Sequence, residues 1–156
     1  MKKTILLLFA IIIFTANGCK NVQQTTTQPE TKNNDYMEMA VLYHQQAAEI
    51  KALYYQSFNL AKLIFEQDVA NTGINQKRAV IVDIDETVLD NSPYEAECVL
   101  GGIAYPLRWD EWVNKGAAAD LPGAVDFLNY AAEKNAEVFY VTNRTENQRE
   151  GTLRNL

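Results

Sequence analysis

Apolar side chains recur at steps of three or four positions along residues 37–69, which is the spacing of one helix face. The face runs through Met39, Tyr43, Ala47, Ile50, Tyr54, Phe58, Ala61 and Phe65. The sequence Asn-Thr-Gly at 71–73 is a typical helix stop. The pattern therefore predicts one long amphipathic helix whose aromatic stripe packs against a core. His44, the only histidine, is expected on this helix, at the surface or half buried and away from any chemical motif.

Two short runs rich in β-branched residues follow, and each is typical of a buried strand. Residues 79–84 (AVIVDI) form the first run and 137–142 (EVFYVT) the second. Helices are expected between them at 109–113 and after 121–123, where one face carries Ala124, Phe127, Leu128 and Ala131. Strand, crossover with a helix, and strand is the βαβ arrangement, so the predicted fold class is α/β, with a parallel sheet flanked by helices.

The first eighteen residues have the layout of a secretory signal peptide. Lys2 and Lys3 precede an almost unbroken apolar run of ten residues, which is too short to cross a hydrocarbon core about 30 Å thick as a helix. Cys19 follows small residues as in a bacterial lipoprotein signal, so we expect lipidation of Cys19; plain secretion and an uncleaved anchor are the alternatives. The polar stretch 19–35 is expected to be a disordered tether, which leaves 36–156 as the folded domain.

The composition is that of an ordinary globular protein, with 47% hydrophobic and 22% charged residues, and its length suffices for one domain. The net charge is -6, and the two lysines of the leader make the rest more acidic still. An acidic surface repels phosphate backbones, which argues against nucleic-acid binding but not against a small phosphate ester held by a metal ion. Two cysteines are too few for a disulfide scaffold, and Cys98 is expected to be a half-buried hydrophobe.

Two aspartates, Asp83 and Asp85, lie at the carboxyl end of the first predicted strand, where open parallel sheets bind ligands. Strand side chains alternate faces, so these carboxylates would point the same way and need a cation or a shared proton between them. Mg²⁺ with oxygen ligands meets that need. One carboxylate can then attack phosphorus while the other donates a proton to the leaving oxygen, the metal ion neutralising charge on the phosphoryl oxygens. The alternative is a solvated turn without chemistry.

The sequence VTNR at 141–144 ends the second predicted strand. The Thr142 hydroxyl could donate to a phosphoryl oxygen, and Asn143 and Arg144 add further donors. The alternative is a helix N-cap, and both interpretations can hold together because a helix start also attracts phosphate.

The run IVDIDETVLDNSPY at 81–94 resembles the signature of the class C acid phosphatases, the bacterial lipoprotein 5'-nucleotidase family of the haloacid-dehalogenase (HAD) superfamily. The segments RWDEWV, PGAVDFLNY and FYVTNR resemble family members in order and spacing. The resemblance implies a Rossmann-like HAD fold with an N-terminal helical segment and a small cap insert. It also implies a phosphomonoesterase that uses Mg²⁺ or another divalent cation. Nucleoside monophosphates or similar small esters would be its substrates, and a lipid anchor would hold it at the bacterial cell envelope, in the outer membrane.

By the same resemblance, Asp83 is the nucleophile and Asp85 the acid/base. The metal would be contacted by the Asp83 carboxylate and the Asp85 backbone carbonyl, and the phosphoryl group by Thr142 and Asn143. Trp109 falls where the family has an aromatic side chain that stacks on the substrate's base; the alternative is a core residue of the cap.

Members of the family continue beyond the VTNR helix with a lysine that grips phosphate and an aspartate pair that completes the metal site. No residue of this sequence can be assigned to either. We therefore expect a truncated member that has little or no activity by itself. The alternatives are a non-catalytic tethered lipoprotein and another HAD reaction, such as phosphotransfer.

Overall fold

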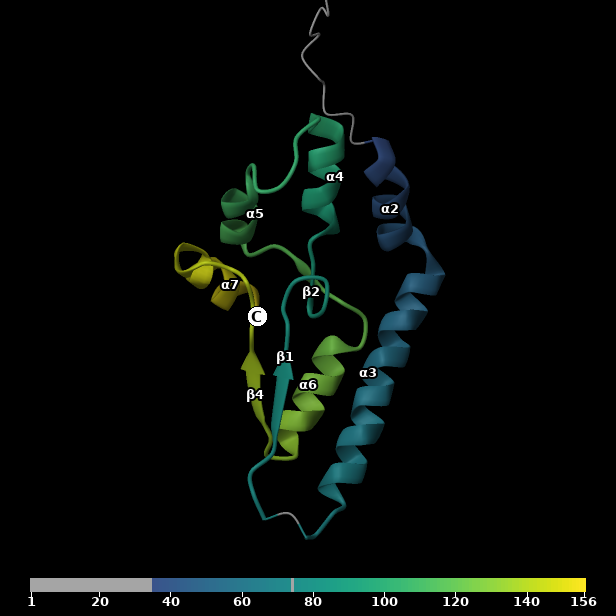
Figure 1. The fold of residues 1–156 in the computed structure, drawn as a ribbon, viewed down its shortest axis with the longest axis vertical. Coiled ribbons are helices and arrows are strands. Elements are labelled where there is room, and N and C mark those ends of the chain that lie inside the picture. The colour runs from purple at the N-terminus through teal and green to yellow at the C-terminus, as the bar shows by residue number, and fades with distance from the viewer. Residues whose placement is uncertain (1–34, 74) are drawn as a thin grey trace, which may run out of the picture. The chain divides into compact units, whose positions relative to one another are not determined.

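The structure is a computed structural model that describes residues 35–73 and 75–156, all of which belong to one folded unit. Its elements, most of them labelled in Figure 1, are α2 (Asp35–Gln46), α3 (Ala48–Val69), β1 (Ala79–Val82), β2 (Leu89–Asp90), α4 (Ser92–Gly101), α5 (Trp109–Lys115), β3 (Ala119–Asp120), α6 (Ala124–Glu133), β4 (Glu137–Tyr140), the 3-10 helix η1 (Glu146–Gln148) and α7 (Arg149–Asn155). The predicted signal peptide, the lipidation site at Cys19 and the tether up to residue 34 lie outside the described residues. In the described part, no helix is both long and apolar enough to cross a membrane.

The predicted N-terminal helix is in fact two helices, α2 and α3. Ala47 lies between them in an extended conformation, with φ -70° and ψ 133°, and its N–H still bonds to the Tyr43 carbonyl at 3.0 Å. The break changes which positions of α2 face the remainder of the domain. Met39, expected in the core stripe, is 72% exposed, whereas Val41 is buried. The single continuous stripe was therefore a wrong prediction for α2, although Phe65 of α3 lies in the core as expected.

β1 and β4 form the predicted parallel pair, in a register that runs from Ala79 beside Glu137 to Val82 beside Tyr140. The chain between them contains α6, so the βαβ arrangement is confirmed. β2 and β3 form a second, antiparallel pair of two residues each. The carboxyl ends of β1 and β4 consequently lie at the same edge of the sheet.

The main core lies between the β1–β4 pair and the helices α6 and α3, which are arranged in that order in Figure 1. The face of α6 that the sequence predicts is buried throughout, and its members are Ala124, Phe127, Leu128 and Ala131. Phe127 packs edge-on against Phe65 of α3, with ring centroids 6.4 Å apart. Edge-to-face packing of this kind favours a defined arrangement of the two helices.

The other face of the β1–β4 pair is exposed. Ile81 and its register partner Phe139 are 73% and 51% exposed, and Val141 beyond β4 is 60% exposed. The prediction of fully buried strands was therefore wrong for the described part of the chain, because α6 and α3 cover only one face of the pair.

A second apolar cluster belongs to the segment between β1 and β4 that contains α4 and α5. Its buried members are Tyr94, Cys98, Trp109, Trp112 and Val113. We call this segment, which carries α4 and α5, the cap segment, after the small cap insert that the resemblance implies. Cys98, expected to be half buried, is fully buried there.

Candidate active site

A groove of about 330 Å³ at the carboxyl ends of β1 and β4 brings together three of the predicted site residues. It is lined by Ile81, Val82, Asp83, Val141, Thr142 and Asn143. Asp83 directly follows β1, and Thr142 and Asn143 come just after β4. Because parallel strands end at the same edge of a sheet, the expected nucleophile and the expected phosphate-binding residues share one groove.

The Asp83 side chain is free to act on a ligand in this groove. Asp83 is exposed, and its Oδ2 atom lies 3.5 Å from the Thr87 hydroxyl, a long contact. Within the described residues, its carboxylate makes no other hydrogen bond or ion pair. An exposed carboxylate with so few partners can approach a phosphorus atom as a nucleophile.

The Asp85 carboxylate, in contrast, is held firmly by its neighbours. Arg144 donates from Nη2 to Oδ1 at 2.6 Å and from Nε to Oδ1 and Oδ2 at 3.0 and 3.2 Å. Asn91 donates from Nδ2 to Oδ1 at 2.9 Å, and the Thr142 hydroxyl lies 3.4 Å from Oδ2. The Arg144 side chain is 3% exposed and also donates to Thr152 at 3.0 Å. The charge of Asp85 is thus compensated by a buried guanidinium.

This ion pair corrects one expectation. Arg144 was expected among the donors to a phosphoryl group, but its guanidinium is directed at Asp85 and Thr152. The sequence does not show that parallel pairing brings residue 144 beside residue 85. Arg144 supplies positive charge to Asp85, and a cation near Asp83 and Asp85 stays a prediction.

The helix N-cap expected at VTNR occurs one residue later, at Thr145. Its side chain and that of Gln148 form a reciprocal capping box at the start of η1, with the Thr145 N–H bonded to Gln148 Oε1 at 3.0 Å. The Thr142 hydroxyl instead accepts a bond from the Arg144 N–H at 3.1 Å. Thr142 therefore shapes the turn that leads Arg144 toward Asp85.

Trp109 is buried in the second apolar cluster. Its ring packs edge-on against Tyr94 and Tyr105, at centroid distances of 5.0 and 5.8 Å, and the Arg144 guanidinium lies 5.6 Å from its ring centre. The alternative of a core residue describes this position well. Stacking on a substrate's base stays a prediction.

Asn91 and Trp112 were not identified as site residues from the sequence. Asn91 is 1% exposed and bonds to Asp85, and the Trp112 indole donates to Asn91 Oδ1 at 2.8 Å. Asn91 falls inside the 81–94 run, and this motif was the sequence feature that could have marked it as a site residue. No spacing rule links Trp112 to it, because the contact is formed by the fold of the cap segment.

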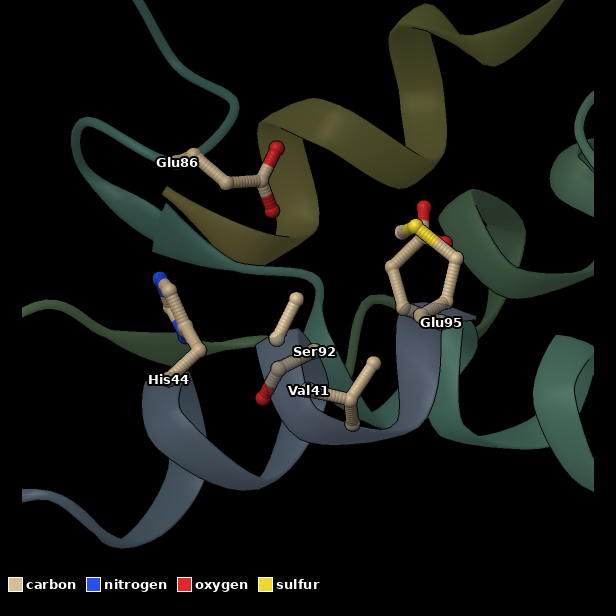
Figure 2. A pocket seen from close by; sticks show the side chains of 7 residues that line it. Val41, His44, Glu86, Ser92 and Glu95 are labelled. Carbon is tan, nitrogen blue, oxygen red and sulfur yellow. The ribbon is translucent and has the colours of Figure 1, made fainter. Parts of the chain in front are cut away.

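Another hollow, of about 280 Å³, lies between α2, residue 86 and the first turns of α4 (Figure 2). Its lining residues are Met37, Ala40, Val41, His44, Glu86, Ser92 and Glu95. Partial desolvation of the carboxyl groups raises the pKa of Glu86 and of Glu95; hydrogen bonds from Asn91 oppose the shift at Glu86. None of the predicted catalytic residues lines this hollow.

His44 is half buried as expected but does not lie away from the motif. Its Nε2 atom is 3.1 Å from the Tyr54 hydroxyl, which donates to the Glu86 carbonyl at 2.9 Å. Its Nδ1 atom is 3.5 Å from Asp90 Oδ1. The expectation of a remote histidine was wrong because α2 packs against α4 and brings His44 to the 86–90 loop.

A divalent cation would find one suitable side chain in the groove. The Asp83 carboxylate has room for it, whereas the Asp85 carboxylate is occupied by Arg144. Across residues 35–73 and 75–156, no group of three or more His, Cys, Asp or Glu is placed to hold a metal ion. Mg²⁺ is commonly bound through one or two carboxylates with water and substrate phosphate as further ligands, so Asp83 fits as one ligand of such a site.

Comparisons with known proteins agree with this geometry. The family model of HAD superfamily subfamily IIIB (acid phosphatase) matches residues 7–156. Two solved structures of the class C acid phosphatase from Bacillus anthracis, one with tungstate bound, are 46% and 45% identical, with TM-scores of 0.77 and 0.75. Acid phosphatase 1 from Solanum lycopersicum is 32% identical over 77 residues.

The similarity extends over parts of each protein. It covers 80% of this chain and 52% of each bacterial structure, and 49% of this chain and 30% of the tomato protein. The chain therefore spans about half the length of the bacterial structures. The α/β fold class predicted from the sequence is confirmed. The chain belongs to the acid phosphatases of subfamily IIIB of the HAD superfamily.

Proposed function

We propose that the protein containing this chain hydrolyses small phosphate monoesters through an aspartyl-phosphate formed on Asp83. The observation that carries the proposal is the groove at the strand ends, which holds an exposed carboxylate together with Thr142 and Asn143. Asp83 supplies the nucleophile, and the Thr142 hydroxyl and Asn143 amide supply neutral donors for phosphoryl oxygens. The fixed carboxylate of Asp85 lies two residues further along the chain.

In the first step, an Asp83 oxygen forms a bond to phosphorus while the bond from phosphorus to the leaving oxygen breaks. Asp85 donates its proton to that leaving oxygen, so that an alcohol departs. In the second step, water attacks the acyl phosphate, Asp85 takes the water's proton, and the bond from Asp83 to phosphorus breaks to release inorganic phosphate. A divalent cation such as Mg²⁺, when bound at Asp83, would neutralise negative charge on the phosphoryl oxygens.

The relatives support a site for a tetrahedral oxyanion. One of the two Bacillus anthracis structures contains tungstate, which resembles phosphate in shape and charge. We extend the proposal to nucleoside monophosphates as substrates, with Trp109 stacking on the base. We also place the protein outside the cytoplasm, anchored by a lipid on Cys19.

The 156-residue chain by itself is expected to turn over slowly or not at all. In the described residues, the lining of the groove contains one carboxylate and no lysine or arginine. Phosphoryl transfer depends on cationic groups that neutralise the developing charge. The second candidate function is therefore a tethered lipoprotein that binds without catalysis.

The test uses the protein expressed from its natural gene and measures Mg²⁺-dependent release of phosphate from a nucleoside monophosphate. Asp83→Asn should lower kcat by roughly a thousand-fold or more, because the amide is not a nucleophile. Asp126→Asn, the same chemical change at an exposed position of α6, should leave kcat unchanged. Undiminished turnover by Asp83→Asn would refute the mechanism, and no turnover by the unmodified protein would favour the non-catalytic alternative.

The anchor is tested separately by growing producing cells with a clickable fatty-acid analogue. The unmodified protein should carry the label and fractionate with membranes, and Cys19→Ser should do neither. Cys98→Ser is the matched control, since Cys98 is buried in the cap cluster. An unlabelled protein in the membrane-free fraction would exclude the lipid anchor.

A further inference from the structure

Asn91 lies buried between the expected acid/base and a tryptophan of the cap segment. Its Nδ2 atom is 2.9 Å from Asp85 Oδ1, and its Oδ1 atom is 2.8 Å from the indole Nε1 of Trp112. Asn91 is 1% exposed and Trp112 is 8% exposed. Water therefore has little access to the bond between Asn91 and Trp112.

The backbone of Asn91 is fixed independently of its side chain. Its N–H donates to Glu86 Oε1 at 3.1 Å, and its carbonyl accepts from the N–H groups of Tyr94 and Glu95 at 2.9 and 3.2 Å. Residue 91 thus forms the junction between β2 and α4. The principal freedom left to Asn91 is the orientation of its amide.

Trp112 determines that orientation. An indole N–H can only donate a hydrogen bond, so the atom of Asn91 that faces it must be the carbonyl oxygen. The amide NH₂ group must then face Asp85. In a turned amide, a carbonyl oxygen would meet a carboxylate oxygen, and two acceptors repel each other.

The oriented amide distinguishes the two oxygens of Asp85. Oδ1 accepts from Asn91 Nδ2 and from both Nη2 and Nε of Arg144. Oδ2 has only longer contacts, 3.2 Å from Arg144 Nε and 3.4 Å from the Thr142 hydroxyl. The shorter contacts therefore gather on Oδ1, and Oδ2 is the less constrained oxygen of the carboxylate.

We infer that Trp112 is a positioning residue for catalysis: through the Asn91 amide, it orients the Asp85 carboxylate. The inference rests on the proposed function. Trp112 belongs to α5 of the cap segment, so the cap segment would help to orient the acid/base at the strand ends. Loss of the indole N–H should release the amide, which leaves Asp85 Oδ1 with its bonds to Arg144 alone and its orientation less narrowly defined.

The experiment compares two substrates with different leaving groups in the protein expressed from its natural gene. A nucleoside monophosphate releases a basic alkoxide and needs the proton from Asp85, whereas 4-nitrophenyl phosphate releases a stable phenolate and needs it little. For Trp112→Phe, kcat should fall about ten-fold or more with the nucleotide and by much less with 4-nitrophenyl phosphate. A general loss of structure would lower kcat equally with both substrates, and a disturbed base site around Trp109 would raise the KM of the nucleotide.

Tyr94→Phe is the matched control. It removes the hydroxyl of a neighbouring residue in the same apolar cluster, with its 3.0 Å bond to the Leu107 carbonyl and its bond with Cys98, and leaves the Asn91 side chain untouched. Its losses with the two substrates should be equal. Because Trp112→Phe could fail to fold, a second variant carries benzothienylalanine at 112, which keeps the ring shape and lacks the N–H.

The outcomes separate the two proposals. A selective loss with the nucleotide, in a protein that Asp83→Asn inactivates, supports the positioning role. Equal losses with both substrates for Trp112→Phe and for benzothienylalanine overturn it and leave the proposed function intact. A protein that is inactive from the start, or undiminished by Asp83→Asn, overturns the proposed function and the positioning role with it.

Discussion

Arg144 and Asp85 are 59 positions apart in the sequence and form a partly buried ion pair, with Nη2 of the arginine 2.6 Å from Oδ1 of the aspartate. The side chains are 3% and 24% exposed. Both residues follow strands of the same parallel pair, so the strand register brings them together. The pair joins the β1 loop to the turn before η1 and keeps the acid/base in one place.

Arg144→Gln should destabilise the domain by about 3 kcal/mol, because it leaves the Asp85 charge partly buried and unpaired. The free energy of unfolding is measured by urea denaturation at pH 7. The control is Arg144→Gln in an Asp85→Asn background, where the loss in free energy of unfolding should be smaller. An equal cost in both backgrounds would mean that the two side chains do not interact.

Gly151→Ala should destabilise the contact between α5 and α7. A Cβ atom on Gly151 would lie 2.5 Å from the Val113 carbonyl oxygen and 2.8 Å from Asn114 Cα, both backbone atoms that cannot turn away. Overpacking of this kind costs about 1–3 kcal/mol, which exceeds the gain in helix propensity from glycine to alanine. Urea denaturation should show the loss, whereas Glu150→Ala at the exposed neighbouring position should not. A Gly151→Ala protein as stable as the parent would contradict this packing.

Glu95 should make stability depend on pH. Burial raises the pKa of its carboxyl group in the folded protein. The folded state therefore holds the Glu95 proton more tightly than the unfolded chain does. The stability that this proton contributes is complete below the ordinary glutamate pKa and is lost as the pH rises through the raised pKa. Glu95→Gln cannot ionise, so its stability relative to the parent should increase between about pH 4 and pH 7.

Thermal unfolding at both pH values checks this prediction. Glu97→Gln is the control, because Glu97 faces Arg108 and Lys115 at 3.7 and 3.8 Å and loses those attractions on substitution. Its relative stability should not increase with pH. If Glu95→Gln shows no greater relative stability at pH 7 than at pH 4, the Glu95 carboxyl is not desolvated.

The sequence was most informative where local pattern and tertiary role coincide. The βαβ arrangement was predicted from the two β-branched runs. Its core was predicted from one face of α6, which consists of Ala124, Phe127, Leu128 and Ala131. Asp83, Thr142 and Asn143 share a groove because strand ends meet whatever the details of packing. These features follow from periodicity and from the geometry of parallel sheets.

Other features depend on contacts that no local pattern contains. Alanine is a good helix former, so nothing at Ala47 signals the break between α2 and α3. The apolar run around Ile81 indicates two apolar faces but not whether a neighbouring element covers both. An arginine at a strand end suits a phosphoryl group as well as a carboxylate, and only the fold assigns Arg144 to Asp85.

The central claim, that Asp83 carries the phosphoryl group, is tested most directly by trapping. The protein expressed from its natural gene is mixed with substrate and Mg²⁺, denatured in acid within the first turnovers and reduced with borohydride, which converts an aspartyl-phosphate to homoserine. Peptide mass spectrometry should find homoserine at position 83 and unmodified aspartate at position 85. Homoserine at position 85, or unmodified aspartate at both positions while phosphate is being released, would contradict the account.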